Sequence, residues 1–172
     1  MKMLQILTMV ITCFISIFPF CLLAGNSSPA EYLKVHNDAR AFVGVEPLIW
    51  NEKLESRAQK FVHDHQVDCL DDVRLENNPS GGYGQNIGRV PYNYTALYEV
   101  QHWVSNKEKY DYESNTCIGG RDFDDDCIVY VQIVTKLTTH LGCASAMCHD
   151  NEDRIVTCYY YPKGIVPGQR PY

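Results

Sequence analysis

The positions of the cysteines constrain the fold of this chain more than any other feature of the sequence. Two of the eight cysteines lie in the first 24 residues. The other six follow: Cys69, Cys117, Cys127, Cys143, Cys148 and Cys158. An even number of cysteines in an exported chain predicts three disulfides, for which the sequence alone allows fifteen pairings. A metal site at Cys143, Cys148 and His149 is the weaker alternative, because exported thiols oxidise.

The first 24 residues have the composition of an export signal. Lys2 precedes an apolar run from Leu4 to Ala24, and polar residues follow directly after Gly25. This order matches the charged, apolar and cleavage regions of a signal peptide. We expect residues 1–24 to be removed, by cleavage after Ala24 or Gly25, and the protein to be secreted. The alternative is a retained membrane anchor, because the run is nearly long enough to span a bilayer.

The chain that remains has the size and charge of one acidic extracellular domain. Removal of the signal takes away one lysine, so 14 Lys and Arg stand against 21 Asp and Glu, a net charge of −7. Such a charge argues against nucleic acid as a partner. No second apolar segment of spanning length follows, so we expect no membrane span in the mature chain.

Helical patterns come first along the chain and strand patterns come last. Apolar spacing and capping residues predict helices over residues 30–42, from Asn51 to about Cys69, and from Thr95 to just before Tyr110. Residues 71–91, rich in glycine and asparagine, predict a loop. Strands are predicted over residues 128–135, 141–147 and 154–161. This order favours an α+β fold, with helices packed on an antiparallel sheet.

Several motifs resemble metal-binding or catalytic sites but are better explained as surface or loop residues. His63 and His65, two residues apart on a helix, point to different faces and cannot chelate one ion together. The acidic run at 122–126 begins like a calcium loop, but Cys127 and Ile133 replace its glycine and its bidentate glutamate. The sequence does not exclude a catalytic Ser-His-Asp triad, although the chain has no Gly-x-Ser-x-Gly nucleophile elbow.

Eight short strings occur in a fixed order along the chain. They are HNDAR at 36–40, VEPLIW at 45–50, DC at 68–69, YGQNI at 83–87, WV at 103–104, YESNTC at 112–117, YVQIV at 130–134 and LGCA at 141–144. With the six cysteines, this series resembles the plant pathogenesis-related group-one proteins of the CAP superfamily. The resemblance covers essentially the whole mature chain.

The resemblance implies a fold and a disulfide pattern. It implies a CAP domain over residues 30–161, built as a three-layer α-β-α sandwich with a central antiparallel sheet. It also selects one pairing from the fifteen: Cys69 with Cys148, Cys117 with Cys127, and Cys143 with Cys158.

The resemblance also implies a cleft, whose residues are altered here. The family's cleft normally carries two histidines and two glutamates, which can hold a divalent metal. The matching positions are Asn77, Gln85, Gln101 and Val129. Valine has no donor atom and neutral amides bind zinc poorly, so we expect no metal, no cofactor and no catalytic residue. The alternative role of the amides is to preserve the cleft by hydrogen bonding.

Two further features bear on processing. Residues 162–172 resemble the family's releasable C-terminal defence peptide, with Tyr161 and Pro162 as the candidate junction. The alternative is a proline-stiffened tail that stays packed on the domain. Asn26 and Asn93 lie in N-glycosylation sequons.

The functional expectation is a secreted, non-enzymatic defence-related protein in the plant apoplast. In this family such a protein would bind a sterol or lipid, or serve as a peptide precursor. One alternative is an interaction module with an inert cleft, whose partner would be a receptor or a pathogen protein. The other is a hydrolase that uses the cleft, which the amides disfavour because they do not titrate near working pH.

Overall fold

The computed structural model describes residues 27–67, 69, 81–118, 127–149 and 151–172. The expected signal peptide, its cleavage site and Asn26 lie outside these residues, as does the retained-anchor alternative. No helix in the described ranges is long and apolar enough to cross a membrane.

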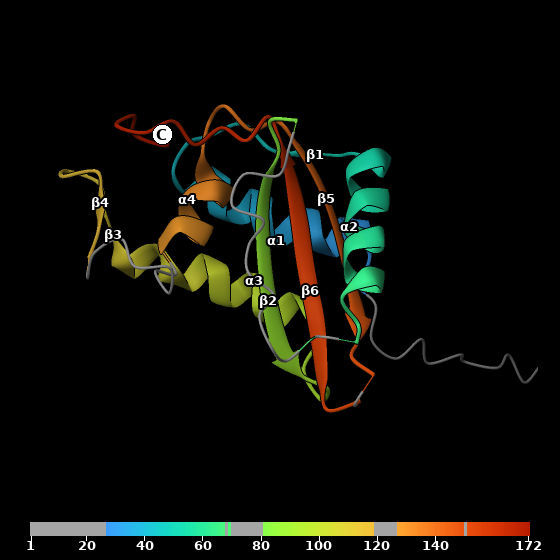
Figure 1. The fold of residues 1–172 in the computed structure, drawn as a ribbon. Coiled ribbons are helices and arrows are strands. Elements are labelled where there is room, and N and C mark those ends of the chain that lie inside the picture. Colours follow the sequence, from blue (N-terminus) through green and yellow to red (C-terminus); the bar gives the residue numbers. More distant parts are fainter. Residues whose placement is uncertain (1–26, 68, 70–80, 119–126, 150) are drawn as a thin grey trace, which may run out of the picture.

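A four-stranded sheet forms the middle layer of the molecule (Figure 1). Its strands, in the order of their pairing, are β1 (Ile49–Trp50), β5 (His140–Met147), β6 (Asp153–Tyr161) and β2 (Gly84–Pro91). Helix α2 (Glu52–Asp64) covers one face, and the other face is covered by α1 (Pro29–Phe42), α3 (Ala96–Ser105) and α4 (Cys127–Val134). The expected α+β arrangement, with helices on both sides of a sheet, is therefore confirmed.

The sheet is mixed rather than antiparallel. Strands β5, β6 and β2 pair in antiparallel fashion, but Ile49 and Trp50 of β1 pair in parallel with His140 and Leu141. The expectation of an antiparallel sheet is wrong at this edge. Two residues are too few to show the alternating pattern by which a strand is recognised.

Local hydrogen bonds set the ends of α1 and α2. Ser28 caps α1 through a capping box with Glu31. The side chain of Asn51 accepts from the first amides of α2, as expected from its position. Helix α2 ends at Asp64, earlier than the predicted end near Cys69. Both the backbone amide and the ring Nδ1 of His65 contact the carbonyl of Phe61, which closes the last turn.

The segment predicted as a strand over residues 128–135 is helix α4. Most of its side chains are buried, so it has no polar face to reveal a helical period. A short apolar run cannot be assigned to helix or strand by periodicity alone. Its β-branched composition is overridden by packing against α1 and α3.

The predicted loop over residues 71–91 ends in strand β2. Two glycines there gave the appearance of a loop, but they serve close packing in the strand. A Cβ on Gly84 would collide with the side chain of Gln132 from α4, and a Cβ on Gly88 would collide with Glu99 from α3. The glycines therefore let two helices approach the sheet.

Alternating residues of β6 divide the interior into two cores. Val156 and Tyr160 face α1, α3 and α4, where they pack with Trp103. Ile155 and Tyr159 face α2 and form the smaller core.

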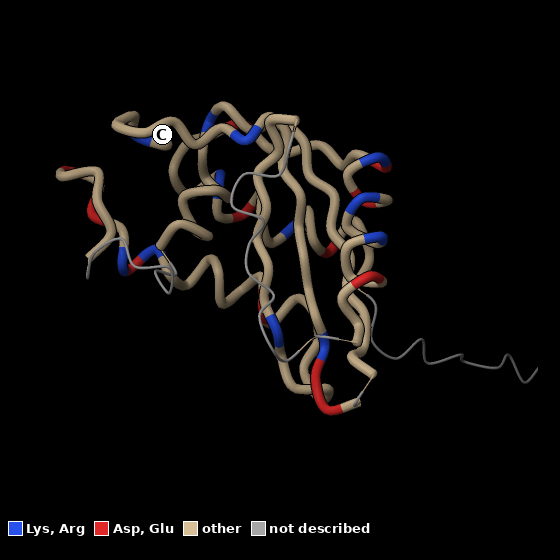
Figure 2. Tube along the Cα trace, in the orientation of Figure 1, with Lys and Arg blue, Asp and Glu red and all other residues tan. Residues whose placement is uncertain are grey.

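The charged residues lie mostly outside the sheet. Lys and Arg alternate with Asp and Glu along α2, whereas the central strands carry few charges (Figure 2).

Three disulfides cross-link the domain. The pairs are Cys69–Cys148, Cys117–Cys127 and Cys143–Cys158. They are the pairs that the family resemblance implies. Both cysteines of the alternative metal site, Cys143 and Cys148, are therefore in disulfides.

After α3, a 3-10 turn (Asn106–Lys109) leads into a small hairpin of β3 (Tyr110–Asp111) and β4 (Thr116–Cys117). The second disulfide joins this hairpin to α4.

Candidate functional site

The candidate site lies where β2 and β6 meet the first helix and α4. Side chains alternate between the faces of β2, so adjacent residues serve different layers. Asn86 reaches the face covered by α4, where its Nδ2 donates to the carbonyl of Val129 at 3.0 Å. Gln85 lies on the face covered by α2, where its Nε2 donates to Thr157 Oγ1 at 3.2 Å.

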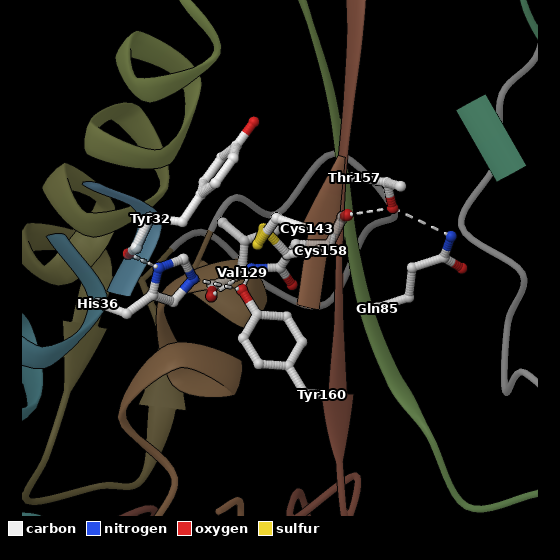
Figure 3. The surroundings of a disulfide bond; sticks show 9 residues. Tyr32, His36, Gln85, Val129, Cys143, Thr157, Cys158 and Tyr160 are labelled. Carbon is white, nitrogen blue, oxygen red and sulfur yellow. Dashed lines mark hydrogen bonds between the residues drawn. A yellow bond between two sulfur atoms is a disulfide. The ribbon is translucent and has the colours of Figure 1, made fainter. Parts of the chain in front are cut away.

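Three buried polar side chains form a chain of hydrogen bonds at this site (Figure 3). His36 Nδ1 lies 2.8 Å from the carbonyl of Tyr32, and its Nε2 lies 3.0 Å from the Tyr160 hydroxyl. The carbonyl can only accept, so Nδ1 carries the proton and Nε2 accepts from Tyr160. The Tyr160 oxygen in turn accepts from Asn86 Nδ2 at 3.1 Å. The chain links α1, β6 and β2 with neutral groups.

The surroundings keep these groups uncharged. His36 has no solvent exposure, and burial lowers its pKa to about 4. Burial also raises the pKa of Tyr160 well above its ordinary value. An imidazole with both nitrogens occupied and no access to solvent cannot exchange protons with a substrate. The arrangement fits a structural role for His36.

The positions expected to replace the family's metal ligands do not come together in the described part of the chain. Asn77 lies outside it. Gln85 is buried on the α2 face, whereas Gln101 is exposed on α3, across the sheet. Val129 is half-buried on α4 and offers only its backbone carbonyl, which Asn86 occupies. Figure 3 shows Gln85 pointing away from Val129 and His36.

These residues do not fit a divalent metal. Among the residues that the structure describes, one group places enough donor atoms together, namely His36, Cys143 and Cys158. Its two sulfurs are bonded to each other as a disulfide, and both nitrogens of its imidazole are hydrogen-bonded. A thiol must be deprotonated and free to bind a metal. This group therefore cannot serve as a metal site.

The C-terminal tail after Tyr161 contacts the domain at both of its ends. Near its start, the carbonyls of Pro162 and Gly164 accept from the hydroxyls of Thr138 and Thr135 at 2.8 and 3.0 Å. At its end, the ring of Tyr172 stacks on Tyr112 with centroids 4.9 Å apart. The candidate junction is thus followed by a segment held at both ends.

The sequence alone did not reveal the buried polar residues that organise the site. Arg40 is nearly fully buried, and its guanidinium donates to the carbonyls of Glu46, Ile133, Thr135 and Thr138 at 2.7 to 3.0 Å. His36 and Arg40 lie one turn apart on the inner stripe of α1, with Tyr32. That spacing is the signal from which their burial could have been inferred.

Comparison with known proteins decides the family. Residues 33–160 match the model of the cysteine-rich secretory protein family, CAP. The chain belongs to the CAP family. The chain is also similar to curated plant proteins over most of its length. It is 37% identical over 166 residues to pathogenesis-related leaf protein 6 of Solanum lycopersicum, covering 96% of this chain and 97% of that protein.

Further relatives and solved structures agree with this assignment. The chain is 39% identical over 148 residues to pathogenesis-related protein 1B of Nicotiana tabacum, covering 86% of this chain and 82% of the relative. The structure of Schistosoma mansoni venom allergen-like protein 4 superposes with a TM-score of 0.61 at 26% identity. That alignment covers 83% of this chain and 91% of the other. The CAP fold is therefore shown by sequence and by structure.

Proposed function

We propose that this CAP protein is a secreted, non-enzymatic defence protein that acts as a binding scaffold for a sterol or lipid in the plant apoplast. The observation that carries the proposal is the placement of Gln85 and Val129. Gln85 presents its side-chain amide to the α2 face of the sheet. Val129 has no side-chain atom that could bind a metal or transfer a proton. Family ligand positions that carry neither titratable nor metal-binding side chains favour binding over catalysis.

The names of the relatives support the defence context. Proteins from tomato and tobacco that cover most of this chain are called pathogenesis-related. The three disulfides support secretion, because such bonds persist in oxidising compartments. The hydrolase alternative is less favoured, since His36, the histidine at the site, is buried and fully hydrogen-bonded.

The peptide-precursor function is supported less well than the binding function. Cutting the chain after Tyr161 would leave the contacts of Thr135, Thr138 and Tyr112 with the tail intact. A cleaved peptide would therefore need to dissociate from the domain before it could act elsewhere. These contacts favour a tail that stays with the domain.

Sterol binding to the purified protein tests the proposal. The secreted chain would be titrated with tritium-labelled cholesterol, and in parallel with a labelled long-chain fatty acid. We expect saturable binding of one of the two probes, with a dissociation constant in the micromolar range. Absence of saturable binding for both would contradict the scaffold proposal and favour the receptor-facing interaction module.

A further inference from the structure

The turn between β2 and α3 presents the sequon of Asn93 at the surface. The amide of Tyr94 donates to the carbonyl of Pro91 at 2.9 Å, which closes a β-turn with Asn93 at its third position. The side chain of Asn93 is exposed. Thr95, the sequon hydroxyl, is the N-cap residue of α3, yet its side chain makes no capping hydrogen bond. The sequon is therefore accessible, and its hydroxyl is not used for capping.

Three exposed tyrosines lie close to this asparagine in the sequence. Tyr92, Tyr94 and Tyr98 are 64%, 41% and 48% exposed. The rings of Tyr94 and Tyr98 contact each other with centroids 4.4 Å apart and planes tilted by 45°. Tyr98 lies on the first turn of α3, where its amide donates to the carbonyl of Thr95 at 3.1 Å. The turn and the helix thus hold the ring of Tyr94, the middle residue of the sequon, against the ring of Tyr98.

We propose that Asn93 carries an N-linked glycan whose first sugar packs on the rings of Tyr94 and Tyr98. The proposal rests on the export of the chain but not on its binding function. In the secretory pathway, an oligosaccharide is transferred from a lipid diphosphate carrier. The bond from sugar C1 to the diphosphate oxygen breaks, the bond from C1 to Asn93 Nδ2 forms, and one amide proton goes to the diphosphate.

The physical basis is the match between a sugar ring and an aromatic face. The C–H groups on one face of a pyranose carry a small positive charge, and the face of a tyrosine ring is negative. Packing the two together also removes apolar ring surface from water. The glycan is covalently attached one residue from Tyr94. Contact between the sugar and the ring is therefore intramolecular and costs less entropy than binding of a free sugar. An attached sugar would therefore cover part of the ring surface that is exposed in the bare polypeptide.

Production in a eukaryotic secretory host tests both parts of the proposal. Mass spectrometry of tryptic peptides measures the occupancy of Asn93 in protein recovered from the medium. The thermal unfolding midpoint is then compared for glycosylated protein and Asn93→Gln, in the native background and in Tyr98→Ala. We expect the glycan to raise the midpoint by about 2 to 4 °C in the native background and by less than half as much in Tyr98→Ala.

Phe42→Ala is the matched control, because Phe42 is a 77% exposed aromatic whose ring contacts Lys107, beyond the far end of α3. The effect of the glycan on the midpoint should be unchanged in this variant. An unoccupied Asn93 in secreted protein would overturn the proposal. So would a glycan effect of equal size with and without the Tyr98 ring. Recovery of the chain in the medium reports on export separately.

Discussion

His36 is a titratable group that folding removes completely from water. Its Nδ1 donates to the carbonyl of Tyr32 and its Nε2 accepts from Tyr160, so the site holds the neutral imidazole. Burial lowers the pKa of His36 to about 4, and the nearby charge of Arg40 acts in the same direction. In the unfolded chain the pKa returns to its ordinary value of about 6.5. The stability of the domain must therefore depend on pH through this residue.

We predict that the free energy of unfolding falls as the pH is lowered from 6.5 to 4. The unfolded chain binds a proton at His36 more readily than the folded chain, so acid favours unfolding. The contribution of His36 is fully present above pH 6.5 and is lost as the pH falls towards 4. A pKa difference of this size corresponds to about 3 kcal/mol. Urea unfolding at a series of pH values measures it.

His36→Gln separates this contribution from the titration of the carboxylates. Glutamine keeps a hydrogen-bonding side chain but does not titrate, so we expect the variant to be less stable at pH 7 and to change less with pH. The informative quantity is the difference between the two stability curves from pH 6.5 to 4. Parallel curves would show that His36 is not the group responsible.

At the scale of elements, caps and periodicity predicted some parts of the fold and failed where packing decides. Helices α1 and α2 carry capping residues, α2 has one apolar face, and β5 and β6 coincide with two of the segments whose composition predicts strands, so these elements could be found from sequence. Helix α4 is buried on nearly every side and has no such pattern. Strand β2 was hidden by Gly84 and Gly88, whose role depends on side chains from distant helices.

The C-terminal tail is the element whose role is most open to test. Tyr172 stacks on Tyr112, accepts a hydrogen bond from the Tyr112 hydroxyl at 2.9 Å through its carbonyl oxygen, and lies beside Tyr110. Arg170 donates to the carbonyls of Tyr112 and Glu113 at 2.9 and 2.8 Å. These contacts join the last residues to the hairpin of β3 and β4.

We predict that Tyr172→Ala loosens the tail and lowers the free energy of unfolding by about 1 to 2 kcal/mol, because it removes one stacked aromatic ring. Limited proteolysis should then cut the tail several-fold faster. Gln169→Ala is the control, since Gln169 is exposed and its backbone amide, not its side chain, donates to the carbonyl of Val166. Equal rates of cleavage in the two variants would contradict a tail held by Tyr172.

At the scale of the whole molecule, the site is assembled from segments far apart in the sequence. His36 and Tyr160 are 124 residues apart, and Asn86 and Tyr160 are 74 apart. No local pattern predicts such pairings. The family resemblance implied the cysteine pairs and the altered ligand positions, but it did not indicate that Gln85 faces α2 while Val129 lies on the other side of the sheet. Strand alternation decides that placement.

The proposed function requires that this CAP domain lacks the divalent metal site of its family. Titration calorimetry with zinc chloride on the purified secreted protein measures whether such a site is present, with Gln85→Ala and Gln101→Ala as paired variants. We expect no stoichiometric binding in the micromolar range, and any weak heat from surface histidines to be the same in all three proteins. Stoichiometric micromolar binding that disappears in Gln85→Ala or Gln101→Ala would contradict the proposed function.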